Sequence, residues 1–155
     1  MRKQRQAWRL ATPEEVHDVA SRLRPSDEEE CRAMYGVSPT SFFAAVGFDP
    51  DNTYSIINDK GLVVAIAGVA PRGDNSAMIW MVGTLDLEKH QLEFLRYSRM
   101  FIEEIGGQYD LLFNWIDARN TTSIKWLQFC GFTLLRKHEV YGAEGIPFFE
   151  FARIK

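Results

Sequence analysis

The sequence predicts a mixed α/β (α+β) domain, with a mostly antiparallel central sheet of about seven strands flanked by helices. Helix-like spacing of apolar residues occupies 13–45, 89–105 and 120–130, and strand-like segments fill the stretches between them. Three consecutive strand patterns over 54–82, separated only by turn residues, are typical of an antiparallel meander. A chain of 155 residues has the length of a single domain, which we expect to span 1–155 with a basic tail at 1–6.

The N-terminal third combines one short strand with three helices. Residues 7–12 favour a strand, and the T-P-E-E motif that follows supplies Thr12 as a helix cap. That helix is expected to run to about residue 23. A second helix is predicted over 27–35, with its acidic residues in the first turn, where the helix dipole favours them. A third begins at Ser38 and Pro39 and ends near Gly47.

A hairpin and a long helix follow. Strands are predicted at 54–58 and 62–70, joined by the D-K-G turn, and a third apolar strand at 77–82. The apolar stripe over 89–105 predicts a helix that ends at two consecutive glycines.

The stretch from 111 to 132 has the strongest local signals in the chain. Residues 111–117 favour a short buried strand, Asn120 can cap the helix that follows, and Gly131 can end it in a left-handed conformation. One face of this helix is expected to carry Ser123, Trp126, Leu127 and Cys130. Two more strands, at 133–140 and 148–154, complete the expected order.

Composition excludes several function classes. The formal net charge of −3 gives no general attraction to nucleic acid. No stretch approaches the roughly 20 apolar residues that span a bilayer, so we expect no membrane partner. Cys31 and Cys130 lack metal-ligand spacing, so neither a disulfide nor a metal site is expected. The basic N-terminus leads into no apolar core, so the chain is predicted to be intracellular.

The unit at 111–132 resembles the last strand and helix of the GNAT acetyltransferase superfamily, whose pattern is Asn-x-x-Ala, an apolar-Tyr pair and then Gly-Phe. The resemblance implies that the fourth and fifth strands, here 77–82 and 111–117, splay apart and that acetyl-CoA enters the gap. The backbone of Met81, Val82 and Gly83 would then pair with its pantetheine arm, because parted strands leave amides and carbonyls unpaired.

Two departures from the family pattern concern the cofactor and the general acid. The glycine-rich phosphate loop of the family is replaced by V-G-T-L-D-L-E-K-H-Q. Thr84 and Lys89 are the remaining candidates for cofactor contacts in this segment. Alternatively, Thr84 or Asp86 caps the helix and Lys89 faces water. Leu127 falls where many members carry the tyrosine that protonates the leaving thiolate. The candidate substitutes are Ser123, Cys130 and Tyr141, each of which has an alternative packing role. Asn120 and Ser123 are the further residues expected at the cofactor.

A general base must remove a proton from the acceptor ammonium, and a partly buried carboxylate or histidine suits that role. Asp117, at the end of the strand predicted at 111–117, and His90, near the expected cleft, are the catalytic candidates. Alternatively, Asp117 satisfies backbone amides at the helix start or pairs with Arg119. Asn114 is a polar residue on an otherwise apolar strand face and requires a partner.

A narrower resemblance rests on the combination of W-M-V-G-T, E-K-H, N-W-I-D-A-R-N, G-F and Y-G-A-E-G-I-P-F-F. Together these segments resemble the acetyltransferase-like proteins of T7-type tailed bacteriophages. This resemblance implies a product of the bacterial host cytoplasm, with phage virion or host proteins as partners. Two functions follow as hypotheses: acetyl transfer from acetyl-CoA to a primary amine of a protein or small molecule, and a catalytically silent virion assembly or adaptor component.

Overall fold

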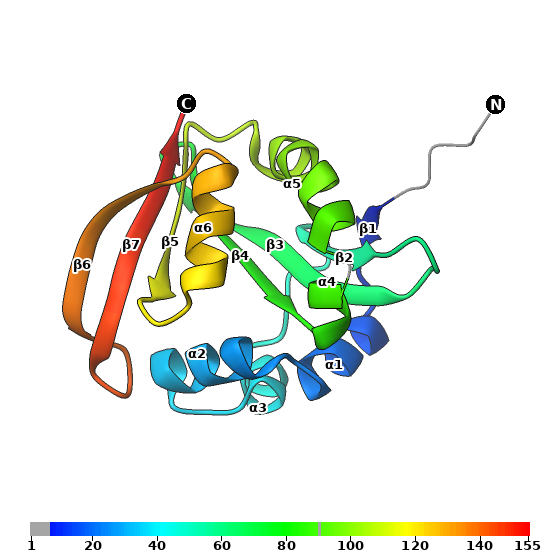
Figure 1. Ribbon diagram of the computed structural model, residues 1–155, viewed down its shortest axis with the longest axis horizontal. Coiled ribbons are helices and arrows are strands. Elements are labelled where there is room, and N and C mark those ends of the chain that lie inside the picture. The colour runs from blue at the N-terminus through cyan, green and yellow to red at the C-terminus, as the bar shows by residue number, and fades with distance from the viewer. Residues whose placement is uncertain (1–6, 90) are drawn as a thin grey trace.

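A seven-stranded sheet in the order β1-β2-β3-β4-β5-β7-β6 forms the centre of the protein (Figure 1). The computed structural model describes residues 7–89 and 91–155, so the predicted basic tail and His90 lie outside the described residues. Every neighbouring pair is antiparallel except β4 and β5, which confirms the predicted fold class. The strands are β1 Trp8–Leu10, β2 Thr53–Ile57, β3 Val63–Gly73, β4 Ser76–Gly83, β5 Leu111–Asp117, β6 Thr133–Tyr141 and β7 Ile146–Ile154.

Helices cover the sheet in two groups. The first three gather at one end of the sheet, while α5 and α6 lie beside its opposite end and its front in the view of Figure 1. The helices are α1 Pro13–Ser21, α2 Pro25–Tyr35, α3 Pro39–Val46, α4 Leu85–Lys89, α5 Gln91–Gly106 and α6 Thr121–Phe129. Each of the first three begins with proline at its first turn, where the missing amide hydrogen costs nothing. None of the described helices is both long and apolar enough to cross a membrane.

The two faces of the sheet carry separate cores, and the alternation of side chains along β4 shows how they are divided. Ile79 belongs to the larger core, with Met81 packed against it, and this core includes residues of α5 and α6. Trp80 and Val82 pack instead against a second core built around Val16, Val19 and Leu23 in the α1 region. Because neighbouring residues of a strand point to opposite faces, β4 contacts both cores.

The predicted divergence of the fourth and fifth strands is present. Pairing of β4 with β5 is limited to Ser76–Met78 against Leu111–Phe113. Beyond this point the strands separate, and β4 and β5 point away from each other toward the helices at the end of the sheet (Figure 1). Asn114 spans the start of the opening, where its Nδ2 donates to Ile79 O at 2.8 Å and its Oδ1 accepts from Trp115 N at 2.8 Å.

Most predicted elements occur within a few residues of their expected bounds, with one clear exception. The segment between β4 and the long helix forms an additional five-residue helix, α4. A single turn and a half is too short to create an apolar periodicity, so the sequence pattern gave no signal for it. The predicted long helix over 89–105 is therefore α5, which begins at Gln91.

Candidate functional site

A cavity of about 350 Å³ passes through the sheet at the opening between β4 and β5. Its lining includes Ile79 and Met81 from one face of β4 and Trp80 and Val82 from the other. Helix α6 contributes to one side of the cavity, and α2 and α3 contribute to the other. The opening therefore connects the two faces of the sheet.

The edge of β4 that faces the opening offers unpaired backbone groups at Met81. Ile79 O accepts from Asn114, and Gly83 N donates to Asp27 Oδ2 at 2.7 Å, so both residues direct their backbone groups toward this edge. Successive residues of a strand alternate in this direction, so Met81 directs its N–H and C=O to the same edge. No β5 residue pairs with Met81, because the ladder ends at Met78 and Phe113. A ligand with amide groups could satisfy these two backbone groups.

Helix α2 closes the wide end of the opening with two carboxylates one turn apart. Asp27 Oδ2 accepts from Gly83 N on β4, and Glu30 Oε1 accepts from Asp117 N on β5 at 2.8 Å. Arg24, the residue before α2, donates to Asp27 at 2.8 Å, and its own backbone N donates to Gly83 O at 2.9 Å. Two of the acids predicted to begin this helix, Asp27 and Glu30, thus bind the diverging strands, a role that the sequence did not predict.

Glu30 is the acid of this group without a cation partner in the described part of the chain, since Asp27 pairs with Arg24 and Asp117 with Arg119. It lines the cavity, and none of the hydrogen bonds among the described residues uses its Oε2. Burial raises the pKa of Glu30 to about 8, the negative charges of Asp27 and Asp117 add to that rise, and the Asp117 amide and Arg24 oppose it. A carboxyl group with this pKa can accept a proton near neutral pH, as a general base must.

Asp117 takes the structural role that the sequence left open. Its side chain is buried, and its Oδ1 accepts from Arg119 N at 2.9 Å. Its Oδ2 accepts from the Arg119 guanidinium at 2.7 Å, so both oxygens are occupied. Asp117 is also absent from the cavity lining. Its catalytic role stays a prediction that this geometry disfavours.

The predicted α6 residues meet the cavity in different ways. Asn120 lines it, but its Oδ1 also accepts from Ser123 N at 3.2 Å as the helix cap. The Ser123 hydroxyl lines the cavity and accepts from Arg24 Nη2 at 3.4 Å. Leu127 presents an apolar wall at the position where the family pattern places a tyrosine. Cys130 is buried against Ser98 instead, with 3.6 Å between Sγ and Oγ.

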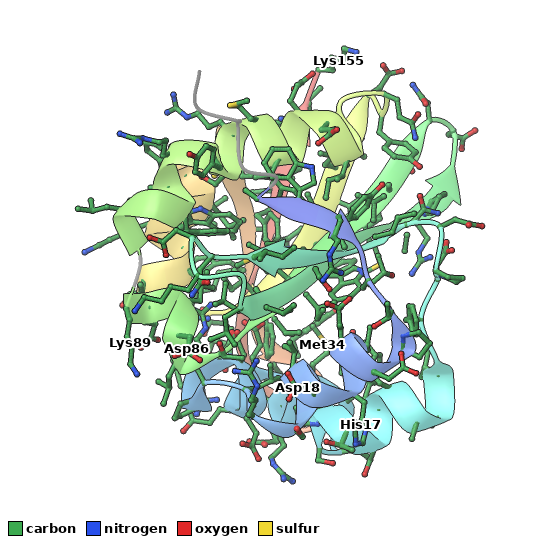
Figure 2. All side chains as sticks on the ribbon, turned by 90° about the vertical axis from the view of Figure 1, so that its right-hand side faces the viewer. His17, Asp18, Met34, Asp86, Lys89 and Lys155 are labelled. Carbon is green, nitrogen blue, oxygen red and sulfur yellow. The ribbon has the colours of Figure 1, made fainter. Side chains whose placement is uncertain are left out.

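The region that should bind the diphosphate has a different chemistry. Thr84 is buried, and both its backbone N and its hydroxyl donate to Val64 O at 2.9 Å. Lys89 lies at the surface of α4 beside Asp86, 3.6 Å away (Figure 2). Asp86 and Glu88 add negative charge to this short helix, which disfavours an anion. The backbone of Met81 therefore fits a cofactor arm. Val82 lines the cavity, but its backbone faces β3, and Gly83 has its N–H and C=O engaged by Asp27 and Arg24, so neither backbone is open to the arm as predicted. Thr84 and Lys89 fit a diphosphate poorly.

Sequence reasoning missed Glu30 and Asp27 as site residues. Their spacing of three places them on one face of α2, which the sequence does show. Four consecutive acids at 27–30, however, give no indication of which face is buried. His90, the other predicted catalytic residue, lies outside the described residues.

The sheet order, the opening between β4 and β5, and the helix that follows β5 together form a GNAT-like fold, as seen in the solved N-acetyltransferases of that superfamily. No family model matches the sequence, and no curated protein matches it.

Three solved structures show the likeness. A GCN5-related N-acetyltransferase from Kribbella flavida is 13% identical, with a TM-score of 0.69 and coverage of 96% of both chains. A phosphinothricin acetyltransferase from Sinorhizobium meliloti, in complex with AcCoA, is 13% identical with a TM-score of 0.69, over 95% of this chain and 86% of that one. The Escherichia coli ribosomal-protein-S18-alanine N-acetyltransferase is 13% identical with a TM-score of 0.64, over 95% and 92%. At these identities the likeness concerns the fold.

Proposed function

We propose that the protein is an acetyl-CoA-dependent N-acetyltransferase that uses Glu30 as its general base. The observation that carries this proposal is the cavity through the sheet, which places the unpaired β4 edge at Met81 and the free oxygen of Glu30 in one space. All three similar proteins named above are acetyltransferases, and the Sinorhizobium structure contains AcCoA, which supports acetyl-CoA as the donor.

The residues of the cavity can bind the pantetheine arm of acetyl-CoA, whereas those of α4 fit its diphosphate poorly. The backbone of Met81 would hold the pantetheine arm, with the Val82 side chain beside it and Asn120 and Ser123 on the α6 side. Acetyl-CoA would supply an activated thioester. Its aminolysis forms a C–N bond and breaks the C–S bond. The nitrogen loses two protons in all, the first to Glu30 before attack and the second after the C–N bond forms; the thiolate takes up one proton and the other is released to solvent. Since Leu127 has no proton to donate, we place the acid–base chemistry on Glu30 alone.

Calorimetry with acetyl-CoA tests donor binding, and thiol release with a primary amine tests turnover. Glu30→Gln should retain donor binding and lower the rate of thiol release by about 10²-fold or more, as for other general bases. The wild-type rate should rise with pH around an apparent pKa near 8. The matched control is Glu29→Gln, because Glu29 is the exposed neighbour on the same helix. Absence of acetyl-CoA binding at millimolar concentration would refute the proposal.

The phage-type origin, the location in bacterial cytoplasm and the partners in a virion stay predictions from the narrower resemblance. The similar solved structures are acetyltransferases and give the silent virion role no support. Co-purification of the chain with virion proteins, combined with no binding of acetyl-CoA, would favour that role instead.

A further inference from the structure

The part of the cavity on the α2 and α3 side has aromatic walls. The ring of Tyr35 lies 4.4 Å from that of Phe42, Phe42 lies 5.5 Å from Phe43, and Phe43 lies 6.0 Å from Trp80, centroid to centroid. All four residues line the cavity. Tyr35 is 51% exposed, so this row of rings runs from the surface to β4. Aromatic faces of this kind favour a flat apolar group over a hydrated chain.

This aromatic part is continuous with Glu30. Tyr35 follows Glu30 on α2, and the charge of Glu30 contributes to the raised pKa of Tyr35, which is caused mainly by burial. The donor arm is assigned above to the other side of the cavity, beside Met81 and α6. The aromatic part is therefore the space left for the acceptor, with its amino group directed toward Glu30.

The charges that line the cavity limit the number of ammonium groups it can bind. Asp27 is held by Arg24 and Gly83 N, and Asp49 accepts from Asp51 N and from Asn52 Nδ2 at 2.7 Å. Glu30 is the least engaged of these carboxylates in the described part of the chain, because it accepts one hydrogen bond and has no cation partner, whereas Asp27 and Asp49 each accept two. Arg72 also lines the cavity and has no carboxylate partner among the described residues, so a second ammonium would meet a positive charge.

We infer that the acceptor is a small monoamine whose amino group is carried on an aromatic or similarly apolar body, with that body between the rings of Tyr35, Phe42, Phe43 and Trp80 and the amine at Glu30. This inference rests on the proposed acetyltransferase activity, because it names the acceptor class of the same site. It disfavours polyamines, which need several carboxylates, and peptide N-termini, whose polar backbone would be desolvated against the rings without partners.

The test compares phenethylamine and tryptamine with spermidine and a short peptide that begins with alanine, using the full chain and acetyl-CoA. Thiol release should give kcat/KM values for the two aromatic amines at least about tenfold above those of spermidine and the peptide. Higher activity with spermidine or with the peptide would overturn the inference, as would no turnover of either aromatic amine.

Two variants connect the preference to the aromatic walls. Tyr35→Ala and Phe42→Ala should each raise KM for phenethylamine about tenfold, through loss of a ring contact. Leu62→Ala is the control, because Leu62 is an exposed apolar residue in the β2–β3 turn. Tyr35 is half exposed, so its replacement should not impair folding even if that of Phe42 does.

Calorimetry with acetyl-CoA keeps the two proposals apart. Donor binding with an unchanged KM in both aromatic variants would refute the acceptor class and leave the acetyltransferase proposal standing. No donor binding would refute both.

Discussion

Residues 27–30 are four consecutive acids whose side chains occupy different surroundings. Asp27 is 5% exposed and paired with Arg24, whereas Glu28 and Glu29 face outward. Glu30 reaches the cavity, and no cation of the described residues is in direct contact with it. Burial therefore disfavours the charged form of Glu30, and nearby positive charge offsets this only slightly, so its pKa is raised. This raised pKa affects the stability of the protein as well as catalysis.

Glu30→Gln should stabilise the protein at alkaline pH. In the folded chain the pKa of Glu30 is about 8, against an ordinary value of 4.5, so the unfolded chain releases this proton first as pH rises. The contribution of Glu30 to stability is thus full below pH 4.5 and is lost progressively up to about pH 8. Glutamine keeps the acceptor for Asp117 N but carries no charge. Denaturant unfolding should show the variant close to wild type at pH 4 and more stable by a few kcal/mol at pH 9; an equal difference at both pH values would contradict the assignment.

The sequence could predict residues whose role is local and could not predict those whose role depends on distant partners. The partner of Asp117 is Arg119, two positions away, and this pairing was an explicit alternative. Glu30 contacts Asp117 across 87 positions, and Asp27 contacts Gly83 across 56. Such contacts depend on how α2 is placed against the sheet, which no spacing within α2 encodes.

At the scale of the element, α6 shows how local chemistry defines a helix. Asn120 caps its start, and Gly131 takes a φ of +90° at its end. Gly131 N then donates to Gln128 O and Phe132 N to Leu127 O, the pair of bonds of a Schellman motif. Phe132 is buried and packs edge-on against Phe151. These signals lie within one stretch of sequence, so both ends of the helix were predicted.

Asn120→Ala should lower the free energy of unfolding by about 1 kcal/mol, because Ser123 N loses its capping acceptor. Thr122→Ala is the matched control, since Thr122 is exposed in the same helix and makes no cap. Urea unfolding monitored by tryptophan fluorescence measures both variants. If the two substitutions have the same effect, Asn120 contributes nothing through capping.

Helix α4, in contrast to α6, was not predicted from the sequence. It contains only five residues, and its neighbour Gly83 donates its amide to Asp27 rather than leaving it free for an anion. Arg22 and Lys89 are both paired with Asp86, at 3.3 Å and 3.6 Å. The cations near the expected diphosphate are thus already neutralised by carboxylates of the protein.

We expect the ADP portion of acetyl-CoA to add little to its affinity. The dissociation constants of acetyl-CoA and S-acetyl-pantetheine should agree within about threefold, because α4 offers no free cradle of amides to a diphosphate. The double variant Asp86→Asn, Glu88→Gln should tighten acetyl-CoA binding and leave S-acetyl-pantetheine unchanged, since it removes two negative charges from α4 and releases Lys89 from Asp86. A hundredfold preference of the wild-type protein for acetyl-CoA would show that the diphosphate has a site after all.

At the scale of the whole molecule, the sheet consists of two parts with few direct links. The parts are β1–β4 and β5–β7–β6, and only three residue pairs join β4 to β5. The N-terminal end of α2 supplies a second connection at the far end of the opening, through Asp27 to β4 and Glu30 to β5. The cavity lies between these two connections, so its width depends on both.

Asp27→Ala should destabilise the whole protein, not only the region around the cavity. It leaves the Arg24 guanidinium and the Gly83 amide buried without their partner, and breaking a buried pair of this kind costs about 3–5 kcal/mol. Asp18→Ala is the control: Asp18 forms an ion pair with Arg22 at 3.0 Å on the neighbouring helix, but its side chain is 55% exposed, so we expect a loss below about 1 kcal/mol. Hydrogen exchange should in addition report faster exchange at the amides of Gly83 and Asp117 in the Asp27 variant, because Gly83 N loses its acceptor and α2, which carries the Glu30 acceptor of Asp117 N, loses its link to β4. Equal stability of the two variants, with unchanged exchange at these amides, would mean that the three residue pairs between β4 and β5 suffice to hold the parts of the sheet together.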